Sequence, residues 1–152
     1  MSMELSELAA REAIRDLVAR YAHAADRGRL DELCALFTDD GALRIDEREP
    51  LVGRDAIRAF LGATRTSVRS ETRSALIRHH VSNLQITVDG PESATGVSYF
   101  FVVSERGPDH WGRYRDRYRP DADRWRFAER RVRVDGFAPG SWAEERRRTM
   151  QP

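Results

Sequence analysis

Apolar residues recur every three or four positions through the first part of the chain, a period typical of amphipathic helices. The first predicted helix runs from about residue 5 to residue 25. It should end near Gly28, because glycine readily adopts the left-handed conformation of a helix C-cap. Its apolar face is formed by Ile14, Leu17, Val18, Tyr21, Ala22 and Ala25.

Two more helices are predicted before the middle of the chain. A short one should end in a turn at residues 38–41, since Thr-Asp-Asp-Gly is turn-forming. Its apolar face contains Leu30, Leu33, Cys34 and Phe37. The third begins near Gly53 and presents Ile57, Phe60 and Leu61 on one side. Residues 42–45 between them are predicted to form a short strand.

From Ser74 onward the period of the apolar residues changes to two, which indicates β-strands. Turn-forming sequences at residues 89–91, 107–109 and 120–123 separate the strands predicted at 94–103, 111–119 and 124–134. Successive strands joined by tight turns form an antiparallel meander. Helices followed by strands predict an α+β domain over residues 1–138, in which the helices cover one sheet face. The tail, residues 139–152, is expected to contain a short helix beginning at Ser141.

The strand at residues 111–119 has two chemically different faces, because successive side chains of a strand point to opposite sides. Arginines occupy one parity, and we expect them on the solvent side because charges are rarely buried unpaired. Tyr114, Asp116 and Tyr118 occupy the other parity and should point inward. They would either line a pocket or pack in the core, and both interpretations remain open.

The next strand changes parity along its length. Trp125 and Phe127 share one side, whereas Val132 and Val134 share the other. A β-bulge near residues 129–131 would reconcile them and would aim Arg130 or Arg131 at a pocket. The alternative is a strand buried on both sides, against helices and against a partner subunit.

Composition excludes several classes of function. The formal charge is +1 and all 26 basic residues are arginines, so neither a Schiff-base lysine nor a lysine-dependent phosphate loop is available. Acidic residues interleave with the arginines of residues 113–119, which argues against nucleic-acid binding. No apolar run could span a membrane, and the N-terminus lacks the layout of a signal peptide. With Cys34 as the single cysteine, expected to be buried and inert, we predict a cytoplasmic protein.

Two short stretches contain the candidate chemistry. Tyr21 and Asp26 lie at the end of the first predicted helix, and His79 and His80 lie on the first long strand. We interpret them as one pocket in which a carboxylate faces an imidazole. Taken singly, each residue has a common structural explanation, such as core packing for Tyr21. His23 and His110 are predicted to lie at the surface, and no Cys or His spacing suggests a zinc site.

The order of several motifs resembles the SnoaL-like branch of the nuclear transport factor two-like superfamily, from about Leu8 to Asp135. The motifs are Tyr21 and Asp26 five apart, Leu36-Phe37-Thr38-Asp39-Asp40-Gly41, His79-His80-Val81-Ser82-Asn83, Gly112-Arg113-Tyr114 and Trp125-Arg126-Phe127. The branch is similar to scytalone dehydratase, bile acid dehydratase and ketosteroid isomerase. The resemblance implies a cone-shaped α+β barrel, in which a strongly bent, mostly antiparallel sheet surrounds a cavity closed by helices.

The resemblance also implies roles for particular residues. Asp26 would orient His79, the general base, and Tyr21 matches the Tyr or Lys that stands five positions before the Asp. His80 faces the other way from His79, so only one of the pair can point into the cone. Gly112 and Tyr114 stand where scytalone dehydratase has polar residues that hold a water, which argues against a scytalone-type substrate.

The expected function is therefore a cofactor-independent, metal-free lyase or isomerase acting on a hydrophobic cyclic substrate such as a steroid or polyketide. Expected substrate contacts are Tyr114, Asp116, Tyr118, Phe60, Phe101, Trp125, Arg130 and His80, with Leu61 beside Phe60. The alternative is a non-catalytic relative that binds a small molecule or assists a ring-hydroxylating dioxygenase. A homodimer or homotrimer is expected in either case.

Overall fold

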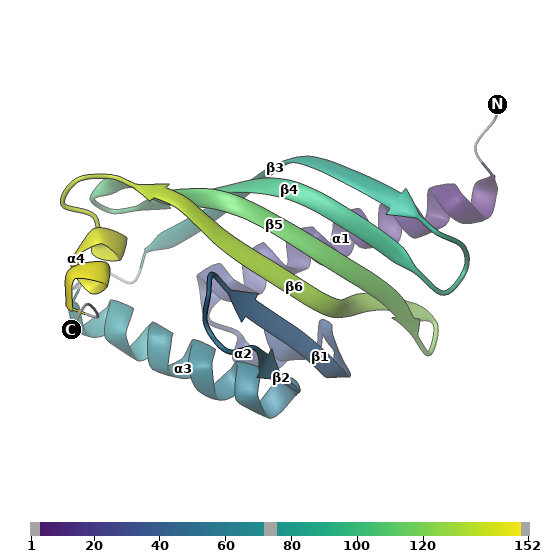
Figure 1. The fold of residues 1–152 in the computed structure, drawn as a ribbon, viewed down its shortest axis with the longest axis horizontal. Helices are drawn as coiled ribbons and strands as arrows, with labels where there is room; N and C mark the ends of the chain where they lie inside the picture. Colours follow the sequence, from purple (N-terminus) through teal and green to yellow (C-terminus); the bar gives the residue numbers. More distant parts are fainter. Residues whose placement is uncertain (1–3, 72–75, 150–152) are drawn as a thin grey trace.

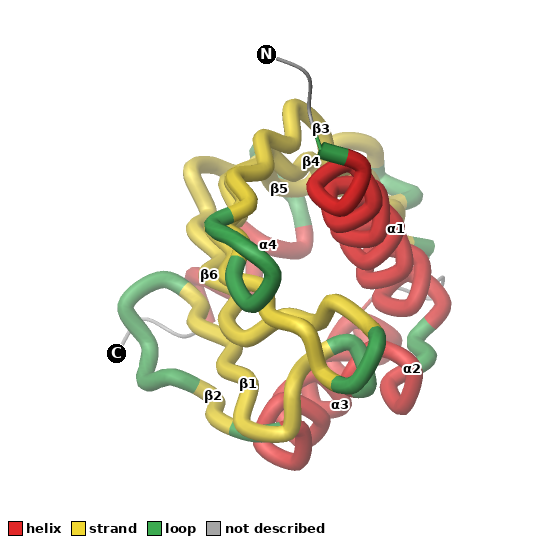
Figure 2. The backbone as a smooth tube through the Cα atoms, turned by 90° about the vertical axis from the view of Figure 1, so that its right-hand side faces the viewer, coloured by secondary structure: helices red, strands yellow, loops and turns green. Residues whose placement is uncertain are grey.

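A computed structural model describes residues 4–71 and 76–149, which form a curved sheet with helices on its concave side (Figures 1 and 2). The predicted start of the strand region at Ser74 lies outside the described residues. The α+β class is confirmed. In chain order the elements are α1 Leu5–Arg27, α2 Leu30–Cys34, β1 Phe37–Ile45, β2 Leu51–Val52, α3 Arg54–Glu71, β3 Ile77–Val88, β4 Ala94–Ser104, β5 Gly107–Asp121, β6 Arg124–Phe137 and α4 Trp142–Thr149.

The described strands form a single sheet in the order β2-β1-β6-β5-β4-β3. Strands β3 to β6 form the predicted antiparallel meander, and β1 adds to β6 in parallel. The sheet bends strongly without closing, so β2 and β3 remain its edges (Figure 1). No helix in residues 4–71 and 76–149 has the length and apolar character needed to cross a membrane.

Helix α1 has one buried face that packs on the sheet. Its buried residues, Ala10, Ile14, Leu17, Val18, Tyr21 and Ala24, follow the predicted period. The helix ends as expected at Gly28, which has φ 62° and ψ 33°. A Cβ at Gly28 would also overlap the guanidinium of Arg65, so both the backbone conformation and the space require glycine there.

The prediction of a helix through Phe37 and a turn at residues 38–41 is wrong. Helix α2 stops at Cys34, and β1 begins at Phe37. The cause is tertiary pairing, because the N–H of Phe127 donates to the carbonyl of Leu36 and the rings of Phe37 and Phe127 lie 5.3 Å apart. A partner strand 90 positions away along the chain overrides the local turn preference. Cys34 is buried as predicted, and burial raises the pKa of its thiol.

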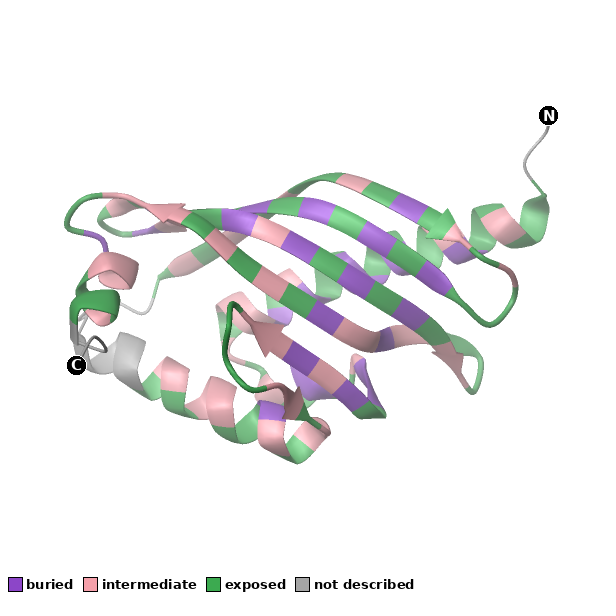
Figure 3. Ribbon diagram, viewed as in Figure 1, coloured by how far each residue is buried: buried purple, intermediate pink, exposed green. Residues whose placement is uncertain are grey.

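Burial alternates along β4 and β5 as the period of two predicts (Figure 3). Tyr114, Asp116 and Tyr118 are buried, whereas Arg115, Arg117 and Arg119 are exposed. Of the two alternatives for the last strand, the structure shows the β-bulge, with a small shift in position. Tyr118 pairs with Phe127 and Arg117 pairs with Glu129, so Ala128 is the extra residue. The bulge turns both Phe127 and Arg130 to the buried face, and leaves the Arg131 side chain 59% exposed.

Helix α4 begins directly after Ser141, as predicted. The hydroxyl of Ser141 accepts the N–H of Glu144 at 3.2 Å, which is a side-chain N-cap. Figure 1 shows α4 at the end of the sheet, beside the start of β5 and the end of β6. The C-terminal segment therefore closes one end of the space beneath the sheet.

Candidate active site

A cavity of about 720 Å³ lies between the concave face of the sheet and helices α1, α3 and α4. Its walls are largely apolar, with Leu33, Leu43, Phe60, Leu61, Ile77, Phe100, Val132, Val134 and Phe137. The polar groups that reach it from several elements include Tyr21, Asp26, His79, His110 and Tyr114. Charged side chains also line it, namely Asp46, Glu47, Arg48, Arg65, Arg133, Asp135, Arg146 and Arg147. The cavity thus combines apolar surface with polar and charged groups that could orient a small molecule.

The structure brings Asp26 and His79 together on the cavity wall. Oδ1 of Asp26, on the last turn of α1, lies 2.6 Å from Nδ1 of His79 on β3. The backbone N–H of His79 also donates to both oxygens of this carboxylate, at 3.1 and 3.2 Å. The Asp26 side chain is 9% exposed and the His79 side chain 21%.

These contacts fix the proton arrangement on the ring. An ionised carboxylate only accepts hydrogen bonds, so Nδ1 of His79 must be the donor in the 2.6 Å contact. The neutral ring then has a free lone pair on Nε2. A molecule held in the cavity could transfer a proton to this nitrogen, and Asp26 would stabilise the imidazolium that forms.

Tyr21 also lines the cavity, about 1.4 helical turns before Asp26. Its ring packs edge-on against the rings of Phe37, Tyr114 and Phe127. Burial raises the pKa of the Tyr21 phenol, and the nearby charge of Arg130 offsets part of this effect. The phenol therefore stays protonated at neutral pH, and a hydrogen bond with Arg130 also contributes to lowering its pKa.

Arg130 and Asp116 do not line the cavity, contrary to the predicted substrate contact, and lie behind its wall. Nε and Nη2 of Arg130 contact the two oxygens of Asp116 at 2.9 and 2.8 Å. The hydroxyl of Tyr118 donates to the same carboxylate at 2.9 Å. The guanidinium lies 4.2 Å from the ring centre of Tyr21 and 4.0 Å from that of Tyr114. The ion pair thus packs behind the part of the cavity wall that Tyr21 and Tyr114 form, on the side of the hydrophobic core.

Among the other predicted contacts, Phe60 and Tyr114 line the cavity. Tyr118 lies in the hydrophobic core, and Trp125 packs against that core without reaching the cavity. Both residues belong to the end of the sheet where β5 turns into β6, far from α4. The predicted cavity roles of Tyr118 and Trp125 are therefore wrong.

Phe101 and His80 lie on the outer face of the sheet. Phe101 is 38% exposed beside Trp111, its partner on β5, which is 40% exposed. Phe100 takes the cavity position instead. Strand β4 is apolar on both faces, so the sequence could not choose between neighbouring phenylalanines. His80 follows His79 and points to solvent for the same alternating reason.

His110 is a cavity residue that the sequence prediction missed. The prediction placed it at the surface in a turn, whereas β5 already begins at Gly107 and His110 lines the cavity. Nδ1 of His110 lies 2.8 Å from Oδ1 of Asp109, which is 2% exposed. A Gly-Pro-Asp sequence gives a strong turn signal, and nothing local reveals the buried pairing. His23, by contrast, is exposed as predicted.

In residues 4–71 and 76–149, no three His, Cys, Asp or Glu side chains are arranged to hold a metal ion. Of the carboxylates on the cavity wall, Asp26 binds the ring and backbone N–H of His79, and Asp46 accepts the backbone N–H of Val134. Glu47 and Asp135 pair with the guanidinium groups of Arg133 and Arg113. The polar groups of the site are thus set up for hydrogen bonding and proton transfer.

The curved sheet, the helices on its concave side and the cavity between them define an NTF2-like fold, also described as cystatin-like. The chain belongs to the SnoaL-like domain family, whose model matches residues 6–131. This membership confirms the resemblance identified from the motifs. No curated protein sequence matches the chain significantly.

Solved structures with this fold cover most of the chain. A scytalone dehydratase-like protein from Novosphingobium aromaticivorans is 25% identical over 90% of this chain and 91% of its own, with a TM-score of 0.78. A variant of Rv3472 from Mycobacterium tuberculosis, of unknown function, is 30% identical over 89% and 78%, with a TM-score of 0.74. Hexachlorocyclohexane dehydrochlorinase LinA-type3 from Novosphingobium barchaimii is 19% identical over 90% and 94%, with a TM-score of 0.75, and shares the fold.

Proposed function

We propose that this protein is a cofactor-independent lyase or isomerase in which His79 is the general base and Asp26 its partner. The observation that carries the proposal is the 2.6 Å contact between Nδ1 of His79 and Oδ1 of Asp26 on the wall of a largely apolar cavity. A positioned base of this kind typically accelerates proton transfer by roughly 10²- to 10⁴-fold.

In the proposed reaction, Nε2 of His79 removes a proton from a carbon next to a carbonyl group. Asp26 stabilises the resulting imidazolium, and Tyr21 donates a hydrogen bond to the carbonyl oxygen as negative charge develops there. A donor aimed at such an oxygen contributes about 10²- to 10³-fold. The enolate then either expels a β-substituent or is protonated elsewhere, so these residues suffice for elimination and for isomerisation.

The cavity supports a hydrophobic cyclic substrate. Its volume of about 720 Å³ lies within the range of sites for drug-sized ligands, and aromatic side chains such as Phe60 and Phe100 would contact ring systems. Steroids and polyketides fit this description. Similarity to the scytalone dehydratase-like protein supports dehydration as the reaction class. Gly112 and Tyr114 still argue against scytalone itself as the substrate.

The test is a substrate screen followed by variant kinetics. Steroids and polycyclic β-hydroxy ketones that raise the melting temperature would be assayed for loss of water or for a shifted double bond by mass spectrometry and NMR. His79→Ala and Asp26→Asn should lose turnover by at least about 100-fold while keeping the wild-type circular dichroism spectrum. His80→Ala, which changes the adjacent solvent-facing imidazole, is the matched control and should keep full activity.

Full activity in both His79→Ala and Asp26→Asn would refute the assignment. Tight binding without turnover by the wild type would instead favour a binding or dioxygenase-accessory domain. Three other expectations stay predictions. They are a homodimer or homotrimer, a cytoplasmic location, and a boundary between domain and tail at residue 138. Light scattering of the purified protein would measure the oligomeric state.

A further inference from the structure

A second imidazole lies on the cavity wall in the same row of the sheet as His79. His79 on β3 pairs with Val102 on β4, and Val102 pairs with His110 on β5. Directly paired residues point to the same face, and both histidines line the cavity. Two interstrand spacings separate their backbones, about 10 Å. Val102, between them, is 1% exposed and does not itself line the cavity.

The two imidazoles are held in the same manner. Each binds a buried carboxylate through Nδ1, at 2.6 Å for His79 with Asp26 and at 2.8 Å for His110 with Asp109. In each case the carboxylate binds Nδ1 and fixes the ring, so it does not occupy the other ring nitrogen, Nε2. The ring of Phe100 also packs edge-on against His110, with 5.8 Å between the ring centres.

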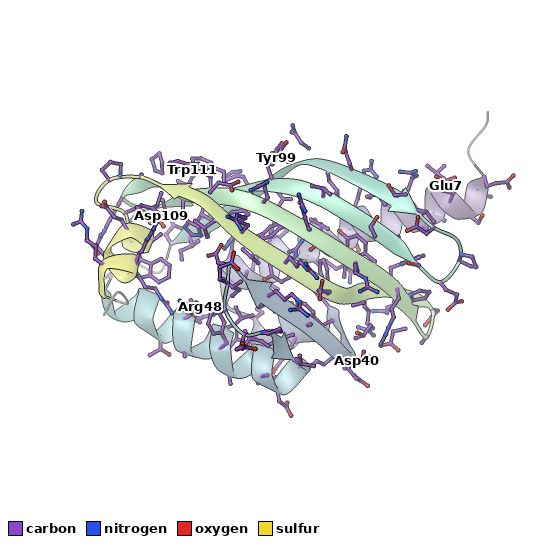
Figure 4. The ribbon with its side chains drawn as sticks, in the orientation of Figure 1. Glu7, Asp40, Arg48, Tyr99, Asp109 and Trp111 are labelled. Atoms are coloured by element: carbon purple, nitrogen blue, oxygen red, sulfur yellow. The ribbon has the colours of Figure 1, made fainter. Side chains whose placement is uncertain are left out.

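A bulge explains how two consecutive residues of β5 can bond to each other. Val103 pairs with Pro108 and Val102 pairs with His110, so Asp109 is the extra residue in the strand. The bulge disrupts the alternation and turns both side chains to the same side of the sheet. Figure 4 shows Asp109 at the α4 end of β5, whereas Trp111 projects from the opposite face.

Helix α4 holds Asp109 in place and keeps it ionised. Its carboxylate accepts the backbone N–H groups of Trp142 at 3.0 Å and Ala143 at 3.3 Å, at the N-terminus of α4. Burial by itself raises the pKa of Asp109, but the hydrogen bonds from His110 and from these two N–H groups outweigh it and hold the pKa below its usual value. Asp109 therefore holds the His110 ring in a fixed orientation through Nδ1.

We propose that His110 is a general acid for the reaction that His79 begins, which makes that reaction the β-elimination of water. A substrate in the cavity would reach Nε2 of His79 with its acidic C–H group and Nε2 of His110 with its β-hydroxyl group. This inference rests on the function proposed above. It selects elimination over isomerisation, because transfer of one proton within an enolate needs no second imidazole.

The proton balance of the step is complete. The C–H bond breaks and its proton goes to His79, while its electron pair forms the carbon–carbon double bond. The C–O bond breaks, and the departing oxygen takes the proton from Nε2 of His110. Water leaves, with His79 protonated and His110 neutral, and proton exchange with solvent through the open cavity resets both rings.

The test separates the two proton transfers. The probe is a decalone with a hydroxyl group β to the ketone, together with its acetate ester, whose leaving group needs no proton. Three rates are measured for each variant: exchange of the α-hydrogen in D₂O, loss of water from the alcohol, and loss of acetate from the ester. Circular dichroism and melting temperature confirm folding of His110→Gln.

In His110→Gln, loss of water should fall by about 100-fold or more, whereas α-hydrogen exchange and loss of acetate should stay within a few-fold of wild type. His79→Ala should lose all three reactions. Asp109→Asn, which changes a positioning residue, should reproduce the pattern of His110→Gln more weakly. His80→Gln is the matched control and should leave all three rates unchanged.

Loss of water at the wild-type rate in His110→Gln would overturn the role of His110 and leave His79 as the base. Parallel loss of all three reactions in His110→Gln would overturn it too, since that pattern indicates a disturbed cavity. Undiminished exchange in His79→Ala would instead refute the proposed function. A wild type inactive in all three reactions on the probe would refute both proposals.

Discussion

Arg130 and Asp116 form an ion pair that is closed off from solvent, with side chains 0% and 1% exposed. Two parallel hydrogen bonds of 2.9 and 2.8 Å join them. Three aromatic rings, from Tyr21, Tyr114 and Phe127, lie within 4.3 Å of the guanidinium carbon. The pair therefore links β5, β6 and the helix α1 residue that faces the cavity.

Breaking this pair should strongly destabilise the fold. Asp116→Ala leaves a buried guanidinium without its counter-charge, and we expect the free energy of unfolding to fall by about 3–5 kcal/mol in urea titrations. Arg20→Ala, which breaks the exposed pair with Asp16, is the control and should change it by under about 1 kcal/mol. Equal losses of unfolding free energy in the two variants would show that the buried pair stabilises the fold no more than the exposed pair does.

Tyr21→Phe should reduce turnover without unfolding the protein. The substitution removes only the phenolic hydroxyl and keeps the ring that packs on Phe37 and Phe127. We expect kcat to fall by about 10²- to 10³-fold once a substrate is known, because a hydrogen bond to the developing oxyanion is lost. Tyr99→Phe, on the outer face and 52% exposed, is the matched control. An unchanged kcat in Tyr21→Phe would remove Tyr21 from the mechanism.

Asp109 should make part of the stability depend on acid pH. Its pKa is lowered in the folded protein, so its contribution is fully present above the unfolded value of about 3.9 and is lost as pH falls through the folded value. Melting temperatures of wild type and Asp109→Asn should therefore differ clearly at pH 6, and the difference should begin to shrink only below about pH 4. A difference that persists unchanged at the lowest pH would contradict the ionised state of Asp109.

Two glycine-to-alanine substitutions should have opposite effects on stability. A Cβ at Gly112 would lie 1.9 Å from the carbonyl oxygen of Arg133 on the adjacent strand, so β5 and β6 would have to separate. We expect Gly112→Ala to cost at least about 1–3 kcal/mol in the free energy of unfolding. In helix α3, a Cβ at Gly62 would meet Leu30 at an ordinary 3.5 Å, and alanine should stabilise by about 0.5–1 kcal/mol. Denaturant titration measures both effects, and a stabilising Gly112→Ala would contradict the close strand contact.

The sequence by itself determined the features that depend on local period. The helix pattern placed α1 and its end at Gly28 correctly, and the alternation of arginines with Tyr114 and Tyr118 assigned the faces of β5. These predictions hold because a helix or strand imposes a fixed spacing on the residues that it buries. The family motifs then indicated which helix-end acid would meet which sheet imidazole.

Tertiary structure alone decided the features in which distant segments meet. Residues 37–41 form part of a strand because they pair with β6. Phe100 rather than Phe101 faces the cavity because pairing with both neighbouring strands sets the register of β4. Asp109 joined His110 because a bulge and the N–H groups of α4 met at one point. Such contacts depend on pairing between residues far apart in the chain, which local spacing does not encode.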